Sequence, residues 1–378
     1  MIPSPALFSL RAVYRSKGRD LRLVGGCVRD MLLGETFKDI DLHTDATPAE
    51  QVEVYQQAGV AYYDTGAQHG TYTVVMDGVA YEITSLREDI STDGRHAEVA
   101  FTRDWTVDLA RRDLTINAMS MSLEGLLEDP FGGEADLKAG RVRFVGRASD
   151  RVQEDYLRIL RFLRFHGRYG RGPYDDEAQA AILAHKGGLK TISSERIWQE
   201  LSKIMVHDSG PMMMRAIDFM GIDVRMAGTR VHPLFDAVHA RTREPATLMV
   251  ALLGDRAIDT GQRLRWSGAD LSLARFLVET FRPFTTENYQ RLVVLNRKPL
   301  GWVIELARLK GDMNAAEALW RWDIPVCPVT GSDLIERGLR TGPGLGGVLD
   351  TIRRRWVDSG YTLTADELML PSYHGVGE

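Results

Sequence analysis

The stretch LVGGCVRDMLLGETFKDIDLHTD, residues 23–45, places a glycine pair, an arginine and two alternating aspartates close together. Residues 21–24, LRLV, are mostly apolar and predict a buried strand, and the glycine pair after them predicts a tight turn. Residues 39–44, DIDLHT, alternate between polar and apolar side chains and predict another strand. The stretch therefore indicates two strands with a short helix between them.

Asp39 and Asp41 are the first candidate site residues. Side chains two positions apart in a strand project from the same face, so the two carboxylates converge on one point. Like charges this close repel unless a cation lies between them, and hard oxygen ligands of this kind suit Mg²⁺. An Asp-x-Asp pair alone is more often a solvated strand edge, so the interpretation depends on the residues around it.

The glycine pair and Arg29 supply those surroundings. Gly26 lets the backbone approach a ligand closely, because glycine has no side chain to clash. Arg29 lies near the start of the expected helix, where a guanidinium and free backbone N–H groups would lie beside a phosphate chain. A glycine pair alone indicates only a tight turn, but together with the two aspartates it predicts a site for a triphosphate and a metal ion.

Two further segments carry charged residues in suggestive patterns. Residues 111–119, RRDLTINAM, begin with two cations and a carboxylate, although a helix start with solvated charges has the same pattern. The segment VQEDYLRILRFLRFHGRYG predicts one helix, in which Asp155 and Arg158 share a face that Arg161 and Arg164 continue. The commoner meaning of that spacing is an intrahelical salt bridge.

Length and composition describe a multi-domain protein. Domains usually hold ~100–200 residues, so 378 residues predict two to four units. Cys27 and Cys327 have no Cys or His neighbour at metal-ligand spacing, which argues against zinc and disulfides and favours buried thiols. The sequence has no apolar run of about 18 residues and no signal peptide pattern at its N-terminus, so we expect a cytoplasmic protein without a membrane partner.

Charge is distributed unevenly along the chain. The net charge of −5 gives no global sign of nucleic acid binding. Residues 141–170, however, hold eight arginines against three carboxylates. This local excess predicts a surface that faces an anion.

The patterns along the chain divide it into an α+β part and an all-α part. In the first third, Thr47 begins a capping box that opens a helix ended by Gly59, and Asp77-Gly78 predicts a two-residue hairpin. From about residue 150 onward, helical patterns separated by Gly, Pro and Ser replace the strand patterns. Boundaries are expected near residues 145, 205 and 325.

In chain order, the segments LVGGCVRDMLLG, KDIDLHTDATP, TGAQHGTYTVV, RRDLTINAM, DPFGG, EDYLRILRFLRF and ISSERIWQEL resemble the class II tRNA nucleotidyltransferases. These are the CCA-adding enzymes and the related bacterial poly(A) polymerases. The resemblance covers residues 21 to about 205. It implies an α+β nucleotidyltransferase head of the polymerase-β-like kind with a mixed sheet at 1–145, a helical neck with base recognition at 146–205, and a helical body and tail that bind tRNA at 206–325 and 326–378.

The resemblance assigns roles to the candidate residues. In this family the two aspartates of the DID segment hold metal ions, here expected to be Mg²⁺, which activate the RNA 3′-hydroxyl for attack on the nucleotide α-phosphate and release of pyrophosphate. Gly26, Arg29 and Arg112 would hold the triphosphate and the ribose. Glu82, in the segment AYEITSL, would supply a third carboxylate, an expectation that rests on its position alone.

The resemblance also implies that Asp155 and Arg158 read the incoming base. Cytosine and adenine both present an amino donor beside a ring nitrogen that accepts, which an Asp acceptor next to an Arg donor complements. Uracil and guanine present the reverse pattern and would leave both protein groups mismatched. Arg161 and Arg164 would contact the nucleotide or support the pair, with CTP and ATP as substrates.

Three alternatives stay open: a poly(A) polymerase, an enzyme that adds only CC or only A, and a non-catalytic RNA-binding module. The segment TGAQHGTYTVV and the non-basic C-terminus LPSYHGVGE favour CCA addition to tRNA over poly(A) synthesis. The segment REDISTDGRHAEVAF resembles the flexible loop that family members use when they switch from C to A. No protein partner is evident.

Overall fold

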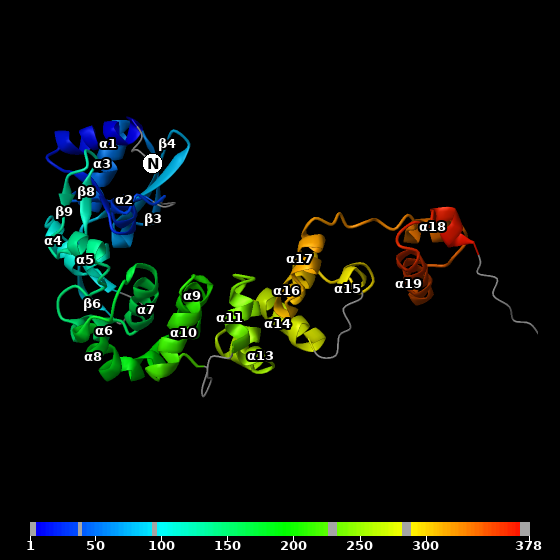
Figure 1. The fold of residues 1–378 in the computed structure, drawn as a ribbon. Helices are drawn as coiled ribbons and strands as arrows, with labels where there is room; N and C mark the ends of the chain where they lie inside the picture. The colour runs from blue at the N-terminus through cyan, green and yellow to red at the C-terminus, as the bar shows by residue number, and fades with distance from the viewer. Residues whose placement is uncertain (1–4, 37–39, 93–96, 226–232, 282–288, 371–378) are drawn as a thin grey trace, which may run out of the picture. The chain divides into compact units, whose positions relative to one another are not determined.

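The chain separates into two compact units, Met1–Gly228 and Thr229–Glu378. The computed structural model (Figure 1) describes residues 5–36, 40–92, 97–225, 233–281 and 289–370. The first unit contains both sheets, and the described part of the second unit is helical. The predicted α+β head followed by helices is therefore confirmed, whereas the finer division at residues 145, 205 and 325 stays a prediction.

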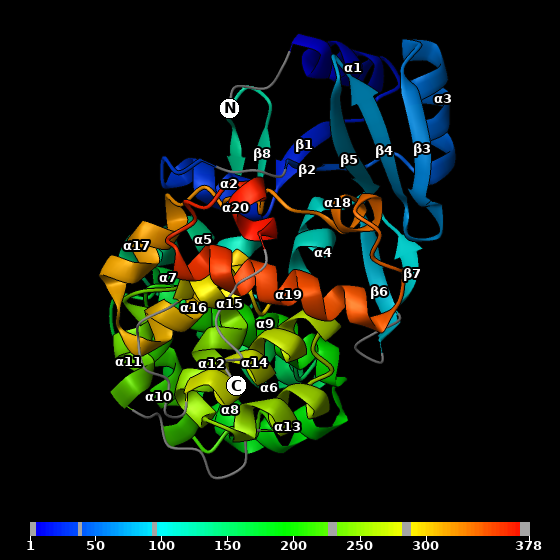
Figure 2. The same ribbon diagram turned by 90° about the vertical axis from the view of Figure 1, so that its right-hand side faces the viewer.

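The N-terminal part of the first unit contains a mixed seven-stranded sheet, most of whose strands are labelled in Figure 2. Its strand order is β3-β4-β5-β2-β1-β8-β9. Strands β2 and β5 are parallel, and the other neighbours are antiparallel. The strands are β1 (Leu21–Val24), β2 (Asp41–Thr44), β3 (Ala61–Gly66), β4 (Thr71–Met76), β5 (Val79–Ser85), β8 (Ser120–Ser122) and β9 (Leu127–Glu128).

Two helices, α1 (Pro5–Ser16) and α3 (Pro48–Ala58), pack against this sheet and complete its core. Tyr14 of α1 and Tyr55 of α3 are fully buried beside apolar residues of the strands, and their rings meet edge to face. Burial of such large side chains is the main stabilising contribution to a core of this kind. Both β1 and β2 contribute to this core, and the candidate site lies where β1 ends and β2 begins.

The turn after β1 has the predicted form. Gly25 has a φ of 70°, in the left-handed region that glycine adopts without strain, and it precedes α2 (Gly26–Leu32). The Gly25 N–H donates to the carbonyl of Met119 at 3.0 Å, so the turn is also tied to the segment that leads into β8. The predicted strand, turn and short helix are confirmed.

Two further local predictions are confirmed. Thr47 and Glu50 form a reciprocal capping box at the start of α3, and Gly59 ends the helix with a φ of 64°. Asp77 and Gly78, with φ values of 51° and 75°, join β4 to β5 in a two-residue hairpin. These features are decided by neighbouring residues, which explains why sequence patterns predict them.

The segment that resembles a flexible loop forms a ribbon of two antiparallel strands. They are β6 (Arg87–Thr92) and β7 (Ala97–Phe101), and residues 93–96 lie outside the described part of the chain. Arg87 pairs with Phe101 at the base of the ribbon. The ribbon thus extends from β5 and leads into the next helix.

The predicted helix across residues 152–170 is wrong in one respect, because it is broken. Helix α6 (Ala148–Glu154) ends at Asp155, which is extended with φ −154° and ψ 105°, and α7 (Arg158–Tyr169) begins three residues later. The Asp155 side chain accepts a hydrogen bond from the Leu157 N–H at 3.1 Å, which competes with the helical pattern. The other helices of this unit are α4 (Trp105–Ala110), α5 (Gly133–Ala139), α8 (Asp176–His185), α9 (Ser194–Val206) and α10 (Gly210–Phe219).

The second unit consists of short helices. They are α11 (Pro233–His239), α12 (Pro245–Leu253), α13 (Arg256–Arg263), α14 (Gly268–Phe281), α15 (Tyr289–Val294), α16 (Leu300–Lys310), α17 (Met313–Trp320), α18 (Gly331–Glu336), α19 (Pro343–Asp358) and α20 (Ala365–Met369). Among the described residues, none of the helices has the length and apolar character needed to cross a membrane. Of the two thiols, Cys27 is buried as predicted, whereas Cys327 is only half-buried.

Candidate active site

The first unit contains a strongly charged pocket of about 510 Å³. The turn after β1, the start of β2, the segment after α4, the break between α6 and α7, and helix α9 all contribute to it. Its lining comprises five arginines, three aspartates and four other residues: Arg29, Arg112, Arg158, Arg161, Arg196, Asp41, Asp113, Asp155, Gly26, Asn117, Leu157 and Phe165. A pocket with this excess of guanidinium groups suits an anionic ligand.

The structure brings most of the predicted site residues together in this pocket. They are Gly26, Arg29, Asp41, Arg112, Asp155, Arg158 and Arg161. Arg164 does not line the pocket, and Asp39 lies outside the described residues, so its prediction stays untested. Three residues that line the pocket, Asp113, Asn117 and Arg196, were not predicted as site residues. The first two belong to the RRDLTINAM segment and the third to ISSERIWQEL, so both segments were recognised without these side chains.

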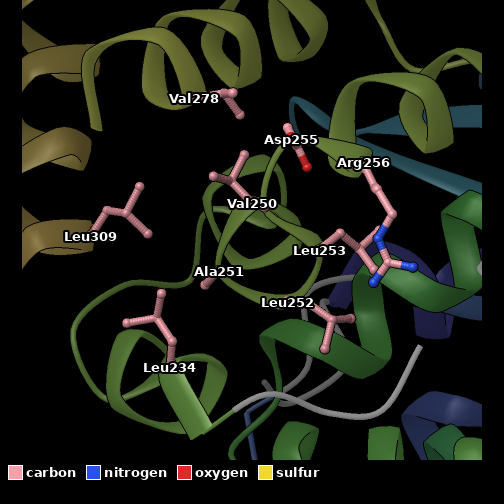
Figure 3. Close-up of a pocket in the computed structure, with 10 residues that line it drawn as sticks. Leu234, Val250, Ala251, Leu252, Leu253, Asp255, Arg256, Val278 and Leu309 are labelled. Carbon is pink, nitrogen blue, oxygen red and sulfur yellow. The ribbon is translucent and has the colours of Figure 1, made fainter. Parts of the chain in front are cut away.

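A cavity in the second unit offers a different chemistry. It has a volume of about 380 Å³ and lies among α11, α12, α14 and α16, next to the start of α13. Figure 3 shows that its lining is mostly aliphatic, with Asp255 and Arg256 as its charged residues. The arginine-rich pocket of the first unit is therefore the candidate site.

Arg29 is held firmly at the edge of the pocket. It is only 6% exposed, and its Nη1 donates to Oδ1 of Asn117 at 2.5 Å while its Nε and Nη2 donate to Asp30. Its guanidinium also lies over the rings of Phe165 and Tyr169, at 5.2 and 4.6 Å from their centroids. These contacts fix the orientation of the cation before any ligand arrives.

Arg112 is held much more loosely. Its Nη1 lies 3.4 Å from the carbonyl oxygen of Asn117, and its Nη2 lies 3.5 Å from Nε2 of His43. Burial lowers the pKa of Arg112, against the opposing effect of the Asp108 and Asp41 carboxylates. Within the described ranges no ion pair joins Arg112 to a carboxylate, so its charge is available to a ligand.

Gly25 provides the space that Arg112 occupies. A Cβ atom built on Gly25 would lie 2.3 Å from Nη1 of Arg112, closer than such atoms can approach. The positive φ of Gly25 adds a second reason for glycine at this position. The first glycine of the pair therefore makes room for a pocket arginine, in addition to forming the turn.

Asp41 begins β2 and lies beside Glu82 of the neighbouring strand. The two residues are register partners in the parallel pair β2–β5, so their side chains project from the same face of the sheet. Two carboxylates in this arrangement are a suitable donor set for a hard divalent cation. No cluster of three potential metal ligands occurs among the residues that the structure describes, a range that leaves out Asp39.

Asp155 and Arg158 both line the pocket, but they do not share a helix face as predicted. The Asp155 carboxylate accepts from the Leu157 N–H and lies 2.7 Å from Nη2 of Arg196. Arg158 instead donates from Nη1 to Glu154 at 2.6 Å. The predicted shared helix face is wrong because the helix breaks at Asp155, whose carboxylate contacts Arg196 of α9, and the alternative of an Asp155–Arg158 salt bridge is not what the side chains form.

A buried chain of polar groups links the two sides of the pocket. Asn117 accepts from Arg29 and donates from Nδ2 to Oδ1 of Asp113 at 3.1 Å, and the other Asp113 oxygen accepts from Arg161 at 2.7 Å. Burial alone would raise the pKa of Asp113, but the charge of Arg161 and the hydrogen bond from Asn117 outweigh it and lower the pKa. This series of hydrogen bonds therefore connects α2 with α7 through polar and charged side chains.

The arginines of residues 141–170 are matched by carboxylates. Arg164, for example, lies 2.7 Å from Glu200 of α9. All eight take part in ion pairs, with Asp136, Asp150, Glu154, Asp113, Glu200 and Glu35 as their partners. The predicted excess of positive charge is thus largely neutralised in the folded unit.

The chain is similar to known proteins over nearly its whole length. Residues 21–143 match the model of the poly A polymerase head domain. The chain is 38% identical to the mitochondrial CCA tRNA nucleotidyltransferase 1 of Danio rerio, over 96% of this chain and 89% of that protein. The corresponding human protein is 37% identical, with 96% and 88% coverage. The chain belongs to the CCA tRNA nucleotidyltransferase family.

Solved structures of this family have the same fold. The CCA-adding enzyme of Bacillus stearothermophilus, solved in complex with CTP, is 26% identical, has a TM-score of 0.76 and matches 95% of this chain and 94% of its own. The CCA-adding enzyme of Thermotoga maritima, solved with a tRNA, is 22% identical with a TM-score of 0.62, a likeness of fold. The family resemblance predicted from the motifs is confirmed.

Proposed function

We propose that this protein adds C, C and A to the 3′ end of tRNA from CTP and ATP, without a nucleic acid template. The observation that carries this proposal is the composition of one pocket. It joins two arginines, Arg29 and Arg112, a sheet carboxylate, Asp41, and Asp155 with Arg158. We assign the first two to the triphosphate and the last two to the base. The full-length similarity to CCA tRNA nucleotidyltransferases supports the same reaction.

The triphosphate binds where the first strand meets α2. Gly26 lets the phosphates approach the backbone, and Arg29 and Arg112 hold their oxygens with guanidinium N–H groups, which match phosphate geometry. Arg29 is oriented by protein contacts, whereas Arg112 carries a charge without a carboxylate partner among the described residues. The two cations offset the charge of the pyrophosphate that leaves.

Asp39, Asp41 and Glu82 would hold the divalent metal that this family implies, and we propose Mg²⁺. When bound, such an ion lowers the pKa of an attacking hydroxyl and offsets the charge that develops at the α-phosphate. The register of Asp41 with Glu82 supports a donor set of carboxylate oxygens.

Asp155 and Arg158 select the base. The carboxylate accepts from the amino group of cytosine or adenine, and the guanidinium donates to the adjacent ring nitrogen. The reversed pattern of uracil or guanine leaves both groups unpaired in a pocket where that is costly. Arg161 and Arg164 follow Arg158 at three-residue spacing along α7 and are held by Asp113 and Glu200, so we assign them a supporting role beside this pair.

The remaining predictions complete the proposal. The neck at 146–205 would carry base recognition, and the body and tail, at 206–325 and 326–378, would receive the tRNA mainly through phosphate contacts and shape. A cytoplasmic location without a protein partner is proposed from the sequence; cell fractionation and size-exclusion chromatography with light scattering of the purified protein test these two points.

The decisive experiment supplies Mg²⁺, CTP and ATP with three tRNAs, which end before CCA, after CC or with complete CCA. We expect the first to gain CCA, the second A and the third nothing, as read by sequencing the 3′ ends. Poly(A) on arbitrary RNA would favour the polymerase alternative. Arrest after CC or addition of A alone would favour an enzyme of divided function, and no incorporation would favour a binding module.

A second experiment tests base selection. Exchange of the two side chains, as Asp155→Arg together with Arg158→Asp, reverses the order of donor and acceptor in the pocket. We expect this variant to accept UTP or GTP and to lose CTP and ATP, while its dependence on Mg²⁺ is unchanged. Retained strict selection of C and A would show that other residues read the base.

A further inference from the structure

His43 is a buried polar residue beside the site to which the proposed reaction assigns no role. It lies on β2, two positions after Asp41, and is 7% exposed. Residues two apart in a strand share a face, so His43 lies on the same side of the sheet as the proposed metal ligand. Its two ring nitrogens contact different charged groups, Asp108 and Arg112.

Asp108 sets the orientation of the imidazole. Nδ1 of His43 lies 2.8 Å from Oδ2 of Asp108, whose side chain is fully buried. The other Asp108 oxygen accepts from the Arg87 N–H at 3.2 Å and from Nε of Arg111 at 3.0 Å. The proton therefore lies on Nδ1, where it is donated to the carboxylate, and the lone pair of Nε2 faces away from it.

The free lone pair of His43 faces Arg112. Nε2 lies 3.5 Å from Nη2 of this arginine, which is bracketed on its other side by the carbonyl of Asn117 and by Gly25. Because an arginine N–H can only donate, Nε2 accepts in this contact, and the ring, whose proton lies on Nδ1, is neutral. Contacts of this length around a site often shorten when the ligand binds.

Arg112 differs from every other arginine of the pocket in its partners. The other four each form an ion pair with a carboxylate at 2.8 Å or less: Arg29 with Asp30, Arg158 with Glu154, Arg161 with Asp113, and Arg196 with Asp155. Over the described residues, Arg112 meets a neutral imidazole in the place where those arginines meet a carboxylate. A carboxylate there would orient the guanidinium but would also compete with phosphate for it.

We propose that His43 is a positioning residue, which orients Arg112 toward the nucleotide triphosphate without neutralising it. This inference rests on the proposed function. Asp108 holds the ring, and the ring holds one N–H of Arg112, while the Asn117 carbonyl holds a second. One N–H on each of Nη1 and Nη2 is left for phosphate oxygens. Asp108 thus orients Arg112 indirectly, through the imidazole ring, and its carboxylate does not contact the guanidinium.

The test measures binding of inorganic tripolyphosphate to the full-length protein by calorimetry, without tRNA. In His43→Asn, the short amide keeps a donor for Asp108 but does not reach Arg112, and we expect about fivefold weaker binding, as for the loss of one ordinary hydrogen bond. His43→Gln places an acceptor near the former Nε2, so it should bind more tightly than His43→Asn. His166→Asn, a buried histidine of α7 outside the pocket, should bind as the wild type does.

A double-mutant cycle that combines His43→Asn with Arg112→Ala separates a positioning role of His43 from a general structural effect. If His43 acts through Arg112, His43→Asn has no further effect in the Arg112→Ala background. In turnover assays the KM for CTP should rise in His43→Asn while kcat changes little. Wild-type affinity in both His43 variants, or a full additional loss in the Arg112→Ala background, would overturn the proposal.

The role of His43 and the phosphate site itself are contradicted by different results. A wild-type protein that binds tripolyphosphate and adds CCA, with His43 variants that do the same equally well, contradicts the role of His43 alone. A wild-type protein that binds no tripolyphosphate contradicts the phosphate site itself, and the role of His43 with it. Thermal melts of each variant show whether it is folded, and His43→Gln provides a second measurement if His43→Asn is not.

Discussion

The carboxylate of Asp155 lies 2.7 Å from the guanidinium of Arg196, although 41 positions separate them in the chain. Arg196 stands in the first turn of α9, where its N–H donates to the capping hydroxyl of Ser193. Asp155 stands at the end of α6, where the break leaves its carboxylate free to face α9. The pair holds an oxygen of the proposed base-reading residue in a defined place.

Arg196→Ala should weaken base selection. Without this cation the Asp155 carboxylate loses its partner and samples more orientations, so we expect the ratio of kcat/KM for CTP over UTP to fall about fivefold. Arg196→Lys keeps the charge and should retain part of the selectivity. Lys203→Ala, at the other end of α9, serves as the matched control. An unchanged ratio in Arg196→Ala would show that Asp155 is oriented by other contacts.

Gly25→Ala should impair both folding and nucleotide binding. The added Cβ would meet Nη1 of Arg112 at 2.3 Å and would also strain a residue with φ of 70°. We expect a loss of about 1–2 kcal/mol in the free energy of unfolding, measured in urea, together with a raised KM for CTP.

Gly18→Ala is a control that separates the backbone strain of Gly25→Ala from its contact with Arg112. Gly18 has the same φ of 70°, but a Cβ there has no atom within 4 Å. The control should therefore lose similar stability from backbone strain and keep the KM of the wild type. If both variants kept a normal KM, the contact between Gly25 and Arg112 would have no bearing on the nucleotide.

Glu82→Gln should reduce catalysis and change its metal dependence. Glu82 is the register partner of Asp41, and removal of its charge weakens the donor set on that face. We expect activity to fall about 10- to 100-fold, the range typical of residues that support a metal site, and the Mg²⁺ concentration for half-maximal rate to rise. Glu53→Gln, an exposed carboxylate of α3, is the control. Normal rates and Mg²⁺ dependence in Glu82→Gln would exclude a third carboxylate at this position.

Asp113 should contribute to the loss of stability in acid. Its pKa is lowered in the folded protein because the charge of Arg161 and the hydrogen bond from Asn117 outweigh the effect of burial. A carboxyl with a lowered folded pKa stabilises the fold above its unfolded pKa, ~3.9, and this contribution is lost as pH falls toward the folded value. The free energy of unfolding should therefore fall less steeply below about pH 5 in Asp113→Asn than in the wild type.

Urea unfolding at a series of pH values measures this difference. Asp218→Asn removes an exposed carboxylate of α10 and should keep the wild-type slope. Equal slopes for Asp113→Asn and the wild type would mean that the buried pair with Arg161 has no part in acid unfolding.

The parts of the fold that sequence patterns predicted are those that neighbouring residues decide. The turn at Gly25, the capping box at Thr47 and the hairpin at Asp77 each depend on backbone angles or hydrogen bonds within a few positions. The helix break at Asp155 was also local, since an Asp whose side chain accepts from the N–H two residues on opposes helix formation. The strong apolar periodicity around it concealed that signal.

Sequence by itself determined the family, the strand and turn that carry the proposed phosphate-binding residues, and the chemical types gathered at the site. Only the tertiary structure decided which charges are available to a ligand. Ion pairing depends on distances between segments that are far apart in the chain: Arg161 meets Asp113, Arg196 meets Asp155, and Arg112 meets the neutral His43. A guanidinium that is paired with a carboxylate binds phosphate less readily than an unpaired one. Which of these similar arginines can bind phosphate most readily is therefore decided only when the chain folds.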